Sequence, residues 1–402
     1  MEKVFIVAAK RTPIGAFGGI LKNTSAGDLA AVAIKGALEA AKLPGDKVDE
    51  VIVGNVVGAG QGMGVGRQAA LFAGIPESVP AYGVNMVCGS GMKTVMDAVS
   101  HIRSGDAEIV VAAGVEVMSQ IPFAAPSSIR DGNKMGNLEL KDLLVADGLT
   151  DVYNQYHMGV TAENVAKQIG LTRQQQDEYA LSSQQKAVAA IEAGKFQDEI
   201  VPVEVKQRRE TVMFDTDEYP KANATMEALS KLRPAFDREG TVTAGNASGI
   251  NDGASAIIVA SESAVKAHGL TPLAEIVSYA QSGLDPKIMG LGPVESVNKA
   301  LEKAELSVHD IDVYELNEAF AAQALGVIHQ LAETNQVPVN AIQDKANFNG
   351  GAIALGHPLG ASGNRILVTL VHELHKQNGQ YGVASLCVGG GMGTAVVVKT
   401  VE

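Results

Sequence analysis

The sequence predicts an α/β protein in which helices cover a sheet. Short apolar runs rich in β-branched residues, typical of buried strands, alternate with stretches of helical periodicity. Apolar residues at helical spacing predict helices over 92–102, followed by Gly105 as a stop, and over 366–374, with Gly379 after them. This alternation is the pattern of an α/β architecture. The predicted strands are 4–9, 51–57, 109–115, 383–386 and 395–398.

A faint internal repeat suggests that the architecture occurs twice. The segment 37–49 matches 300–312 at one constant offset of 263 positions, with Ala-Leu-Glu, Ala, Leu and Asp at corresponding places. Chance similarity of two Ala/Leu/Glu-rich helices is the alternative. Between the copies, a polar stretch loses the alternation and carries a capping-box pattern, Thr172 to Gln175. We therefore expect a first half (1–118 with 250–270), an insertion (119–249) and a second half (271–402).

Composition and charge exclude several classes of protein. The net charge of -13 argues against nucleic-acid binding, which needs surplus Lys and Arg. No apolar run approaches the roughly 20 residues that span a bilayer. The two cysteines lie too far apart in sequence for a disulfide framework. Because a strand-like run follows Met1 almost at once, we expect no signal peptide and a cytoplasmic protein.

Cys88 is the first candidate for chemistry. It lies in the segment NMVCGSGMK, directly before the predicted helix 92–102. A sulfur at a helix N-terminus meets unpaired N–H groups and the positive end of the dipole, so we expect a lowered thiol pKa. The alternative is an inert buried cysteine, the commoner fate of a single thiol.

His357 lies in a second glycine-rich turn, GGAIALGHPLGASG, which also opens a helix. Pro358 removes an N–H donor and restricts His357 to extended backbone, so a catalytic histidine is predicted. A phosphate-binding turn is the rival, although neither a G-x-x-x-x-G-K-[ST] motif nor a strict G-x-G-x-x-G motif near the first strand is present.

Two further motifs follow predicted strands. Cys387, in CVGGGMG, lies beside bare backbone N–H groups, and a disulfide or metal site with Cys88 is the alternative. One His and two Cys without close spacing are poor grounds for zinc, so no metal is expected. Asn317, in ELNEAFAAQ, is either a helix N-cap or a group that holds a water or a carbonyl oxygen.

Together, these four motifs resemble those of a thiolase, in order and in spacing. The resemblance runs from Arg11-Thr12-Pro13-Ile14-Gly15 to the C-terminus. It implies the thiolase fold: two pseudo-symmetric βαβαβαββ halves in an α/β/α/β/α core, with an inserted loop domain that contacts CoA and mediates oligomerisation. It also implies a homotetramer, a dimer of dimers.

The resemblance assigns roles to the candidates. It implies that Cys88 carries the acyl group, that His357 activates it, and that Cys387 is the second acid/base. It places a water held by Asn317, together with His357, in one oxyanion hole, and the N–H groups of Cys88 and Gly389 in the other. The substrate and CoA contacts that it implies are His157, Met158, Lys221, Ala244, Ser248, Ala319 and Phe320.

The activity implied is that of a biosynthetic thiolase, which condenses two acetyl-CoA into acetoacetyl-CoA and CoA. Tyr156-His157-Met158-Gly159 resembles the branch in which a His and a Met narrow the acyl pocket. CoA is substrate and product, and no tightly bound cofactor is expected. A basic patch of Lys221, Arg208, Arg209 and Lys231 is expected to attract CoA. The alternatives are a longer-chain degradative thiolase, a ketoacyl-synthase-like enzyme and a cysteine hydrolase.

Overall fold

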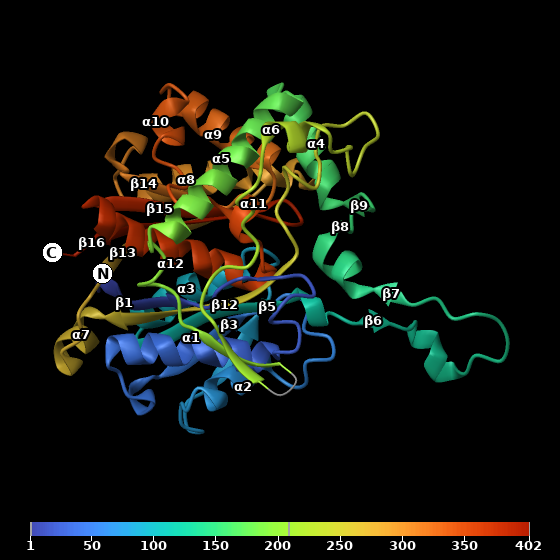
Figure 1. Ribbon diagram of the computed structural model, residues 1–402. Coiled ribbons are helices and arrows are strands. Elements are labelled where there is room, and N and C mark those ends of the chain that lie inside the picture. Colours follow the sequence, from blue (N-terminus) through green and yellow to red (C-terminus); the bar gives the residue numbers. More distant parts are fainter. Residues whose placement is uncertain (1, 208–209, 402) are drawn as a thin grey trace.

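A computed structural model describes residues 2–207 and 210–401 and confirms the α/β architecture (Figure 1). The strands are β1 Val4–Arg11, β2 Gly15–Ala16, β3 Glu50–Gly54, β4 Ala81–Val84, β5 Ile109–Val117, β6 Phe123–Ala124, β7 Lys141–Asp142, β8 Thr150–Asp151, β9 Tyr156–His157, β10 Val203–Gln207, β11 Glu210–Phe214, β12 Asn251–Ser261, β13 Ala274–Gly283, β14 Val313–Leu316, β15 Tyr381–Val388 and β16 Met392–Thr400. The helices are α1 Ala26–Ala41, α2 Val65–Phe72, α3 Ser90–Ser104, α4 Met158–Ile169, α5 Arg173–Glu192, α6 Met226–Ser230, α7 Glu262–His268, α8 Gly292–Lys303, α9 Ala321–Thr334, α10 Asn340–Gln343, α11 Ala352–Leu355 and α12 Leu359–Gln377.

The central sheet has the same strand order in both halves. The first half runs β1-β12-β5-β3-β4 and the second runs β13-β16-β15-β14, and β1 pairs with β13 to join them. In the first half β5, β3 and β4 are parallel, and in the second β15 and β14 are parallel. The carboxyl ends of these parallel strands, where ligands bind in open α/β sheets, carry the candidate residues.

A pair of equivalent carboxylates confirms that the internal repeat is structural. Asp49 Oδ2 accepts hydrogen bonds from the N–H groups of Glu108 and Ile109 at the start of β5. Asp312, at the corresponding place in the second copy, accepts from Gln380 and Tyr381 at the start of β15. Because the two aspartates accept equivalent hydrogen bonds, the offset of 263 positions reflects a shared topology and not chance.

The helices form three layers that pack against the faces of the sheet. On β5, Val111 and Ala113 point into the core beneath α1, whereas Val110 and Ala112 point to the opposite face, as the two-residue period of a strand requires. That second face packs on the central helices α3 and α12, which strands of both halves enclose. Helices α8, α9 and α10 cover the outer face of the second half.

The central helices approach the strands so closely that glycine is required. A Cβ built on Gly114 of β5 would lie 2.3 Å from the carbonyl oxygen of Gly360 in the first turn of α12. One built on Gly91 of α3 would lie 2.7 Å from that same oxygen. The start of α12 in the second half is therefore fitted directly onto backbone of the first half.

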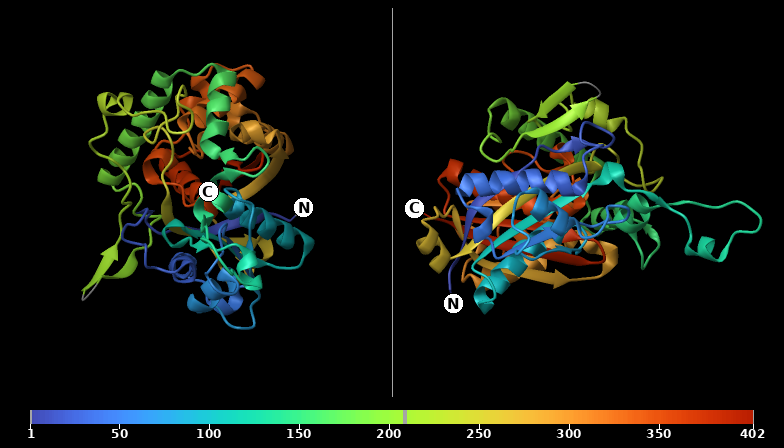
Figure 2. Two further views of the ribbon diagram at one scale, coloured as in Figure 1. Left: turned by 90° about the vertical axis from the view of Figure 1, so that its right-hand side faces the viewer. Right: turned by 90° about the horizontal axis from the view of Figure 1, so that it is seen from below.

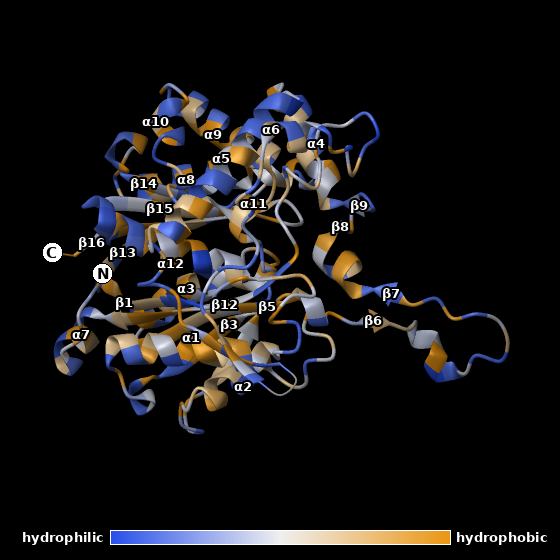
Figure 3. Cartoon of the chain, in the orientation of Figure 1, coloured by the Kyte–Doolittle hydropathy of each residue, from blue (hydrophilic) through white to orange (hydrophobic). Residues whose placement is uncertain are grey.

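The segment 119–249 contributes the helices α4, α5 and α6 and a long arm with β6 and β7. The arm projects from the body, on the side away from the two termini (Figure 1; Figure 2, right). Apolar residues occur at intervals along the arm (Figure 3), and Phe123, Met135 and Leu140 are exposed. The capping box predicted at Thr172 and Gln175 is present at the start of α5.

Three local predictions need correction or comment. Strand β3 ends at Gly54, so the predicted strand 51–57 is too long, because Val56 and Val57 turn away to bind a buried carboxylate. Helix α12 is capped by Asn378 in the left-handed conformation, one residue before Gly379. Gly105 caps α3 as predicted, with φ of 85°.

Among the helices of residues 2–207 and 210–401, none is both long and apolar enough to cross a membrane.

Substitution of Gly114 tests the close fit of α12 onto β5. We expect Gly114→Ala to lower the free energy of unfolding by about 1–3 kcal/mol, because the new methyl group meets backbone that cannot move freely. Gly83→Ala in β4 is the matched control, since its Cβ would have its nearest neighbour at 3.7 Å, and we expect a change within about 0.5 kcal/mol. Equal effects in denaturant unfolding would contradict this packing.

Candidate active site

The turn that carries Cys88 is held by polar side chains in a strained shape. Val87, just before it, has a positive φ of 46°, which is unusual for a β-branched residue. Asn85 Oδ1 accepts a hydrogen bond from the Val87 N–H at 3.0 Å, and the hydroxyl of Ser90 donates to the Val87 carbonyl at 2.7 Å. These bonds fix the backbone and present Cys88 directly before α3.

The sulfur of Cys88 faces the Cys387 turn of the other half. The backbone N–H groups of Gly389 and of Cys88 itself lie close enough to this sulfur to lower its pKa. The two turns are also in van der Waals contact, since a Cβ on Gly89 would lie 2.9 Å from the side chain of Val388. The structure thus brings together the two N–H groups that the resemblance assigns to one oxyanion hole.

The expected lowering of the Cys88 pKa is wrong. Burial raises the pKa of this thiol to about 11, and the charge of Glu116 adds to the increase, whereas the two N–H groups lower it. Only 8% of Cys88 is exposed, and α3 begins two residues later, so desolvation outweighs the helix terminus. Cys88 rests as a neutral thiol and needs a base.

Cys387 lies near the end of β15 and is 1% exposed. Burial raises the pKa of its thiol well above the ordinary range, and the neighbouring sulfur of Cys88 raises it further. Both cysteines are free thiols, so the disulfide alternative is not realised here. Within the part of the chain that the structure describes, no group of three or more His, Cys, Asp and Glu side chains could hold a metal.

His357 is buried, and its Nδ1 lies 2.5 Å from the hydroxyl oxygen of Ser362, which is also 2.9 Å from the Pro358 carbonyl. When that hydroxyl donates to the carbonyl, Nδ1 donates to the hydroxyl and the lone pair lies on Nε2. Nε2 is buried without a partner among the described residues. Burial, together with the charge of Arg365, lowers the pKa of His357 to about 4. At neutral pH the imidazole is a neutral proton acceptor.

Asn317 follows β14 and is not a helix N-cap, since α9 begins four residues later, after Phe320. Its backbone N–H donates to the Ser385 carbonyl at 3.0 Å, which places it beside the end of β15. Its side chain is 1% exposed, yet neither the amide oxygen nor the amide nitrogen has a partner among the described residues. Buried amides are rarely left unpaired, so this geometry favours the alternative in which Asn317 holds a water or a carbonyl oxygen.

The predicted substrate contacts form two groups. The N–H of Ser248 donates to the Ala319 carbonyl at 2.9 Å, and Ala247 pairs with Phe320, so the loop of 246–248 is bound to the Asn317 segment. His157 and Met158 begin α4, and burial lowers the pKa of His157. A Cβ on Gly389 would lie 3.7 Å from the Met158 sulfur, so Met158 reaches the Cys387 turn.

Lys221 and Ala244 are on the surface. The ammonium group of Lys221 lies 5.5 Å from the ring of Tyr219, and its backbone N–H donates to Gln184 at 2.8 Å. Ala244 is exposed on the loop before Ser248. Arg208 and Arg209 lie outside the described residues, and Lys231 pairs with Glu227, one turn away on α6.

Sequence reasoning missed three residues. Ser362, five positions after His357, contacts the Nδ1 atom of its ring, and its place inside the motif was the available signal. Phe236 stacks on His157 with ring centroids 4.5 Å apart and meets the edge of Phe320 at 6.1 Å. Nothing in the surrounding sequence marks it. Glu116, a charge at the end of the apolar run 109–115, was a visible anomaly.

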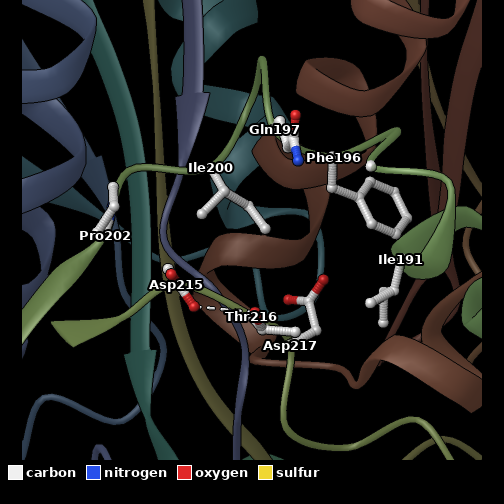
Figure 4. A pocket seen from close by; sticks show the side chains of 9 residues that line it. Ile191, Phe196, Gln197, Ile200, Pro202, Asp215, Thr216 and Asp217 are labelled. Atoms are coloured by element: carbon white, nitrogen blue, oxygen red, sulfur yellow. Dashed lines mark hydrogen bonds between the residues drawn. The ribbon is translucent and has the colours of Figure 1, made fainter. Parts of the chain in front are cut away.

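A separate cavity of about 290 Å³ lies between the end of α5, with the loop that follows it, and the segment directly after β11 (Figure 4). Its lining includes Ile191, Phe196, Ile200 and Asp217, and none of the predicted catalytic residues contributes to it. Asp217 is paired with the buried Arg11, so that carboxylate is already neutralised.

Two thiols, a neutral imidazole and an unpaired amide are the functional groups of acyl transfer through a thioester. The comparisons agree with this class. The thiolase N-terminal domain family matches residues 4–263, and the thiolase C-terminal domain family matches residues 270–400. The chain belongs to the thiolase family.

Relatives match along the whole length. An acetyl-CoA acetyltransferase of Cupriavidus necator is 55% identical over 99% of this chain and 100% of its own. One of Escherichia coli is 53% identical over 99% of each. The crystal structure of human mitochondrial 3-ketoacyl-CoA thiolase in complex with CoA is 47% identical, with a TM-score of 0.93 over 100% of this chain and 98% of that one. The thiolase fold is therefore confirmed.

The neutral state of Cys88 has a measurable consequence. Because the thiol pKa is about 11, we expect its alkylation by iodoacetamide to accelerate about tenfold for each pH unit between roughly pH 7 and 9, following the thiolate fraction. Peptide mass analysis would assign the adduct, and Cys387→Ser would serve as the single-thiol control. A rate that levels off below about pH 8 would show a preformed thiolate and contradict the assignment.

Proposed function

We propose that this chain is an acetyl-CoA C-acetyltransferase that condenses two acetyl-CoA molecules, reversibly, into acetoacetyl-CoA and CoA through an acetyl-Cys88 intermediate. The observation that carries the proposal is the close contact of the Cys88 turn with the Cys387 turn, where a Cβ on Gly89 would lie 2.9 Å from the side chain of Val388 and one on Gly389 would lie 3.2 Å from that of Val87. The names of the bacterial relatives support the same activity.

The first step transfers an acetyl group to sulfur. His357 Nε2 takes the proton of the Cys88 thiol, and the sulfur attacks the thioester carbonyl of the first acetyl-CoA. The N–H groups of Cys88 and Gly389 stabilise the oxyanion that forms, and each such donor contributes roughly 3 to 4 kcal/mol. The bond to the CoA sulfur then breaks, and the Cys387 thiol protonates the departing CoA. The enzyme is left with acetyl-Cys88, imidazolium and a Cys387 thiolate.

The second step forms the carbon–carbon bond. The raised pKa of Cys387 makes its thiolate a strong base, which suits removal of a proton from the methyl carbon of a second acetyl-CoA. The enolate attacks acetyl-Cys88, and the carbon–sulfur bond breaks to release acetoacetyl-CoA. The Cys88 sulfur regains its proton from the His357 imidazolium, so every group returns to its starting state. In thiolysis the steps reverse and the CoA thiol attacks.

A second stabilising site is needed for the enolate oxygen, which lies on a different molecule from the first oxyanion. His357 Nε2, protonated after the first step, is one donor. The unpaired amide of Asn317 supplies the other through a water, in accordance with the family resemblance. His357 Nε2 and both polar atoms of the Asn317 side chain have no hydrogen-bond partner among the described residues, which supports this role.

The acyl pocket is proposed to be short. Met158 reaches the Cys387 turn, and His157 is held by Phe236, which also touches Phe320. In the branch of the family that the sequence resembles, such a His and Met narrow the acyl pocket, which favours acetoacetyl-CoA over longer substrates. The longer-chain alternative remains the second candidate because a 3-ketoacyl-CoA thiolase has the same fold.

The insertion 119–249 is proposed to bind CoA and to join subunits. Ser248 on its edge is bound to the Ala319–Phe320 segment, where the pantetheine arm would approach. Lys221, which is exposed, is the cation proposed to meet the nucleotide. The exposed apolar residues of the arm support contact with other subunits and hence a homotetramer. Since the chemistry needs two reduced thiols, we propose a reducing, cytoplasmic location.

Intact-mass measurement with acetyl-CoA tests the assignment of the two thiols. We expect Cys88→Ala to acquire no acetyl group and to lose turnover. Cys387→Ala should still accept an acetyl group at Cys88, because acyl transfer uses the other sulfur as nucleophile, yet form no acetoacetyl-CoA. An acetylated Cys88→Ala protein would refute the proposed intermediate.

A further inference from the structure

Glu116 is a buried carboxylate to which the proposed mechanism gives no part. It lies near the end of β5 and is 0% exposed. One oxygen, Oε2, accepts from the N–H groups of Val56 at 3.0 Å and Gly360 at 2.9 Å. The other accepts from the Val57 N–H and the Asn55 amide, both at 3.2 Å. All four partners are donors, which is the set that an ionised carboxylate accepts. Burial raises the pKa of Glu116 to about 7, although the bonds from Val57, Val56 and Gly360 lower it, so the carboxylate is mostly ionised at about pH 8.

The bond to Gly360 crosses between the halves and reaches the His357 turn. Helix α12 begins after Pro358, which offers no side-chain acceptor to the first turn. Glu116 supplies that acceptor from a strand 244 positions earlier, where a negative charge also suits the positive end of the helix dipole. Gly360 is only three residues after His357, so this bond limits where the imidazole can lie.

The bond to Val56 leads to the Cys88 turn. The carbonyl of this same residue accepts from the Asn85 side-chain amide at 2.9 Å, and the Asn85 amide oxygen accepts from the Val87 N–H. The path from Glu116 therefore reaches the peptide directly before Cys88. Removing the carboxylate would break the hydrogen bonds that connect both turns to Glu116.

We propose that Glu116 is a positioning residue that holds the Cys88 turn and the His357 turn in register across the interface of the two halves. The inference rests on the proposed acyl transfer from CoA to Cys88. Glu116 touches no substrate and acts through the backbone of the two turns. Displacement of a reacting group by about 1 Å can slow a reaction about 100-fold, so a clamp of this kind governs rate.

The carboxylate also has an electrostatic effect that separates this role from mere stability. The charged groups acting on the Cys88 thiol are Glu116, which raises its pKa, and the neighbouring Cys387 when ionised; Arg365 acts on His357. Loss of the Glu116 charge should therefore make Cys88 easier to ionise. Loss of the carboxylate should therefore slow the acetylation of Cys88, which depends on positioning, and make its thiol more reactive, because more of it is ionised. A loss of stability alone would not produce these opposite changes.

The test compares Glu116→Gln and Glu116→Asp in the full-length protein. Two rate constants are measured, acetylation of Cys88 by acetyl-CoA in a single turnover and alkylation of Cys88 by iodoacetamide at about pH 8. For Glu116→Gln we expect acetylation to fall about 10- to 100-fold, while alkylation becomes at least about threefold faster because the thiolate fraction rises. Glu116→Asp keeps the charge but shortens the side chain, so acetylation should fall with alkylation unchanged within about twofold.

Asp49→Asn is the matched control, because Asp49 accepts two backbone N–H groups at the opposite end of the same strand. It should leave both rate constants within about twofold of the parent. Acetylation at the parent rate in Glu116→Gln would overturn the inference, and so would a parallel loss of acetylation and alkylation. If the parent protein itself were not acetylated at Cys88, the proposed function would fail instead, and the two failures are thus distinguishable.

Discussion

The active site depends on the contact of glycine-rich turns from two halves of one chain. Neither half contains a complete set of reactive groups: Cys88 belongs to the first, whereas His357, Asn317 and Cys387 belong to the second. Backbone must meet backbone for the sulfur of Cys88 to reach the Gly389 N–H. Glycines at Gly89, Gly114 and Gly360 leave the space, because a side chain at any of them would come within 3 Å of its neighbours.

The same contact explains the protonation states. Each half covers the thiol of the other, so burial raises the pKa of both cysteines, whereas burial lowers the pKa of His357. A neutral thiol and a neutral imidazole are the result, and because Ser362 contacts Nδ1 of the imidazole, Nε2 is the nitrogen left without a partner among the described residues. The arrangement stores no reactive thiolate before substrate arrives, and it makes the Cys387 thiolate a strong base when it forms.

Much of the fold could be predicted because its signals are local. Strand β5 opens with three β-branched residues in an apolar run, Gly105 is a left-handed cap, and the repeat contained the aspartates that accept hydrogen bonds at the starts of β5 and β15. The pKa of Cys88 could not be predicted, since its desolvation depends on a core cluster that residues of both halves build in the folded chain. The stacking of Phe236 on His157 and the anchoring by Glu116 were hidden for the same reason: both join segments that only the tertiary fold brings together.

A thiol-bridging reagent measures the meeting of the two sulfurs most directly. Native protein would be treated with 1,3-dibromoacetone, which joins two thiols through a three-carbon bridge, and then digested and mapped by mass spectrometry. The arrangement described here predicts a bridged pair of peptides containing Cys88 and Cys387 in native protein, which disappears when the chain is unfolded before treatment. Separate adducts on the two cysteines of the native protein, with no bridge, would contradict it.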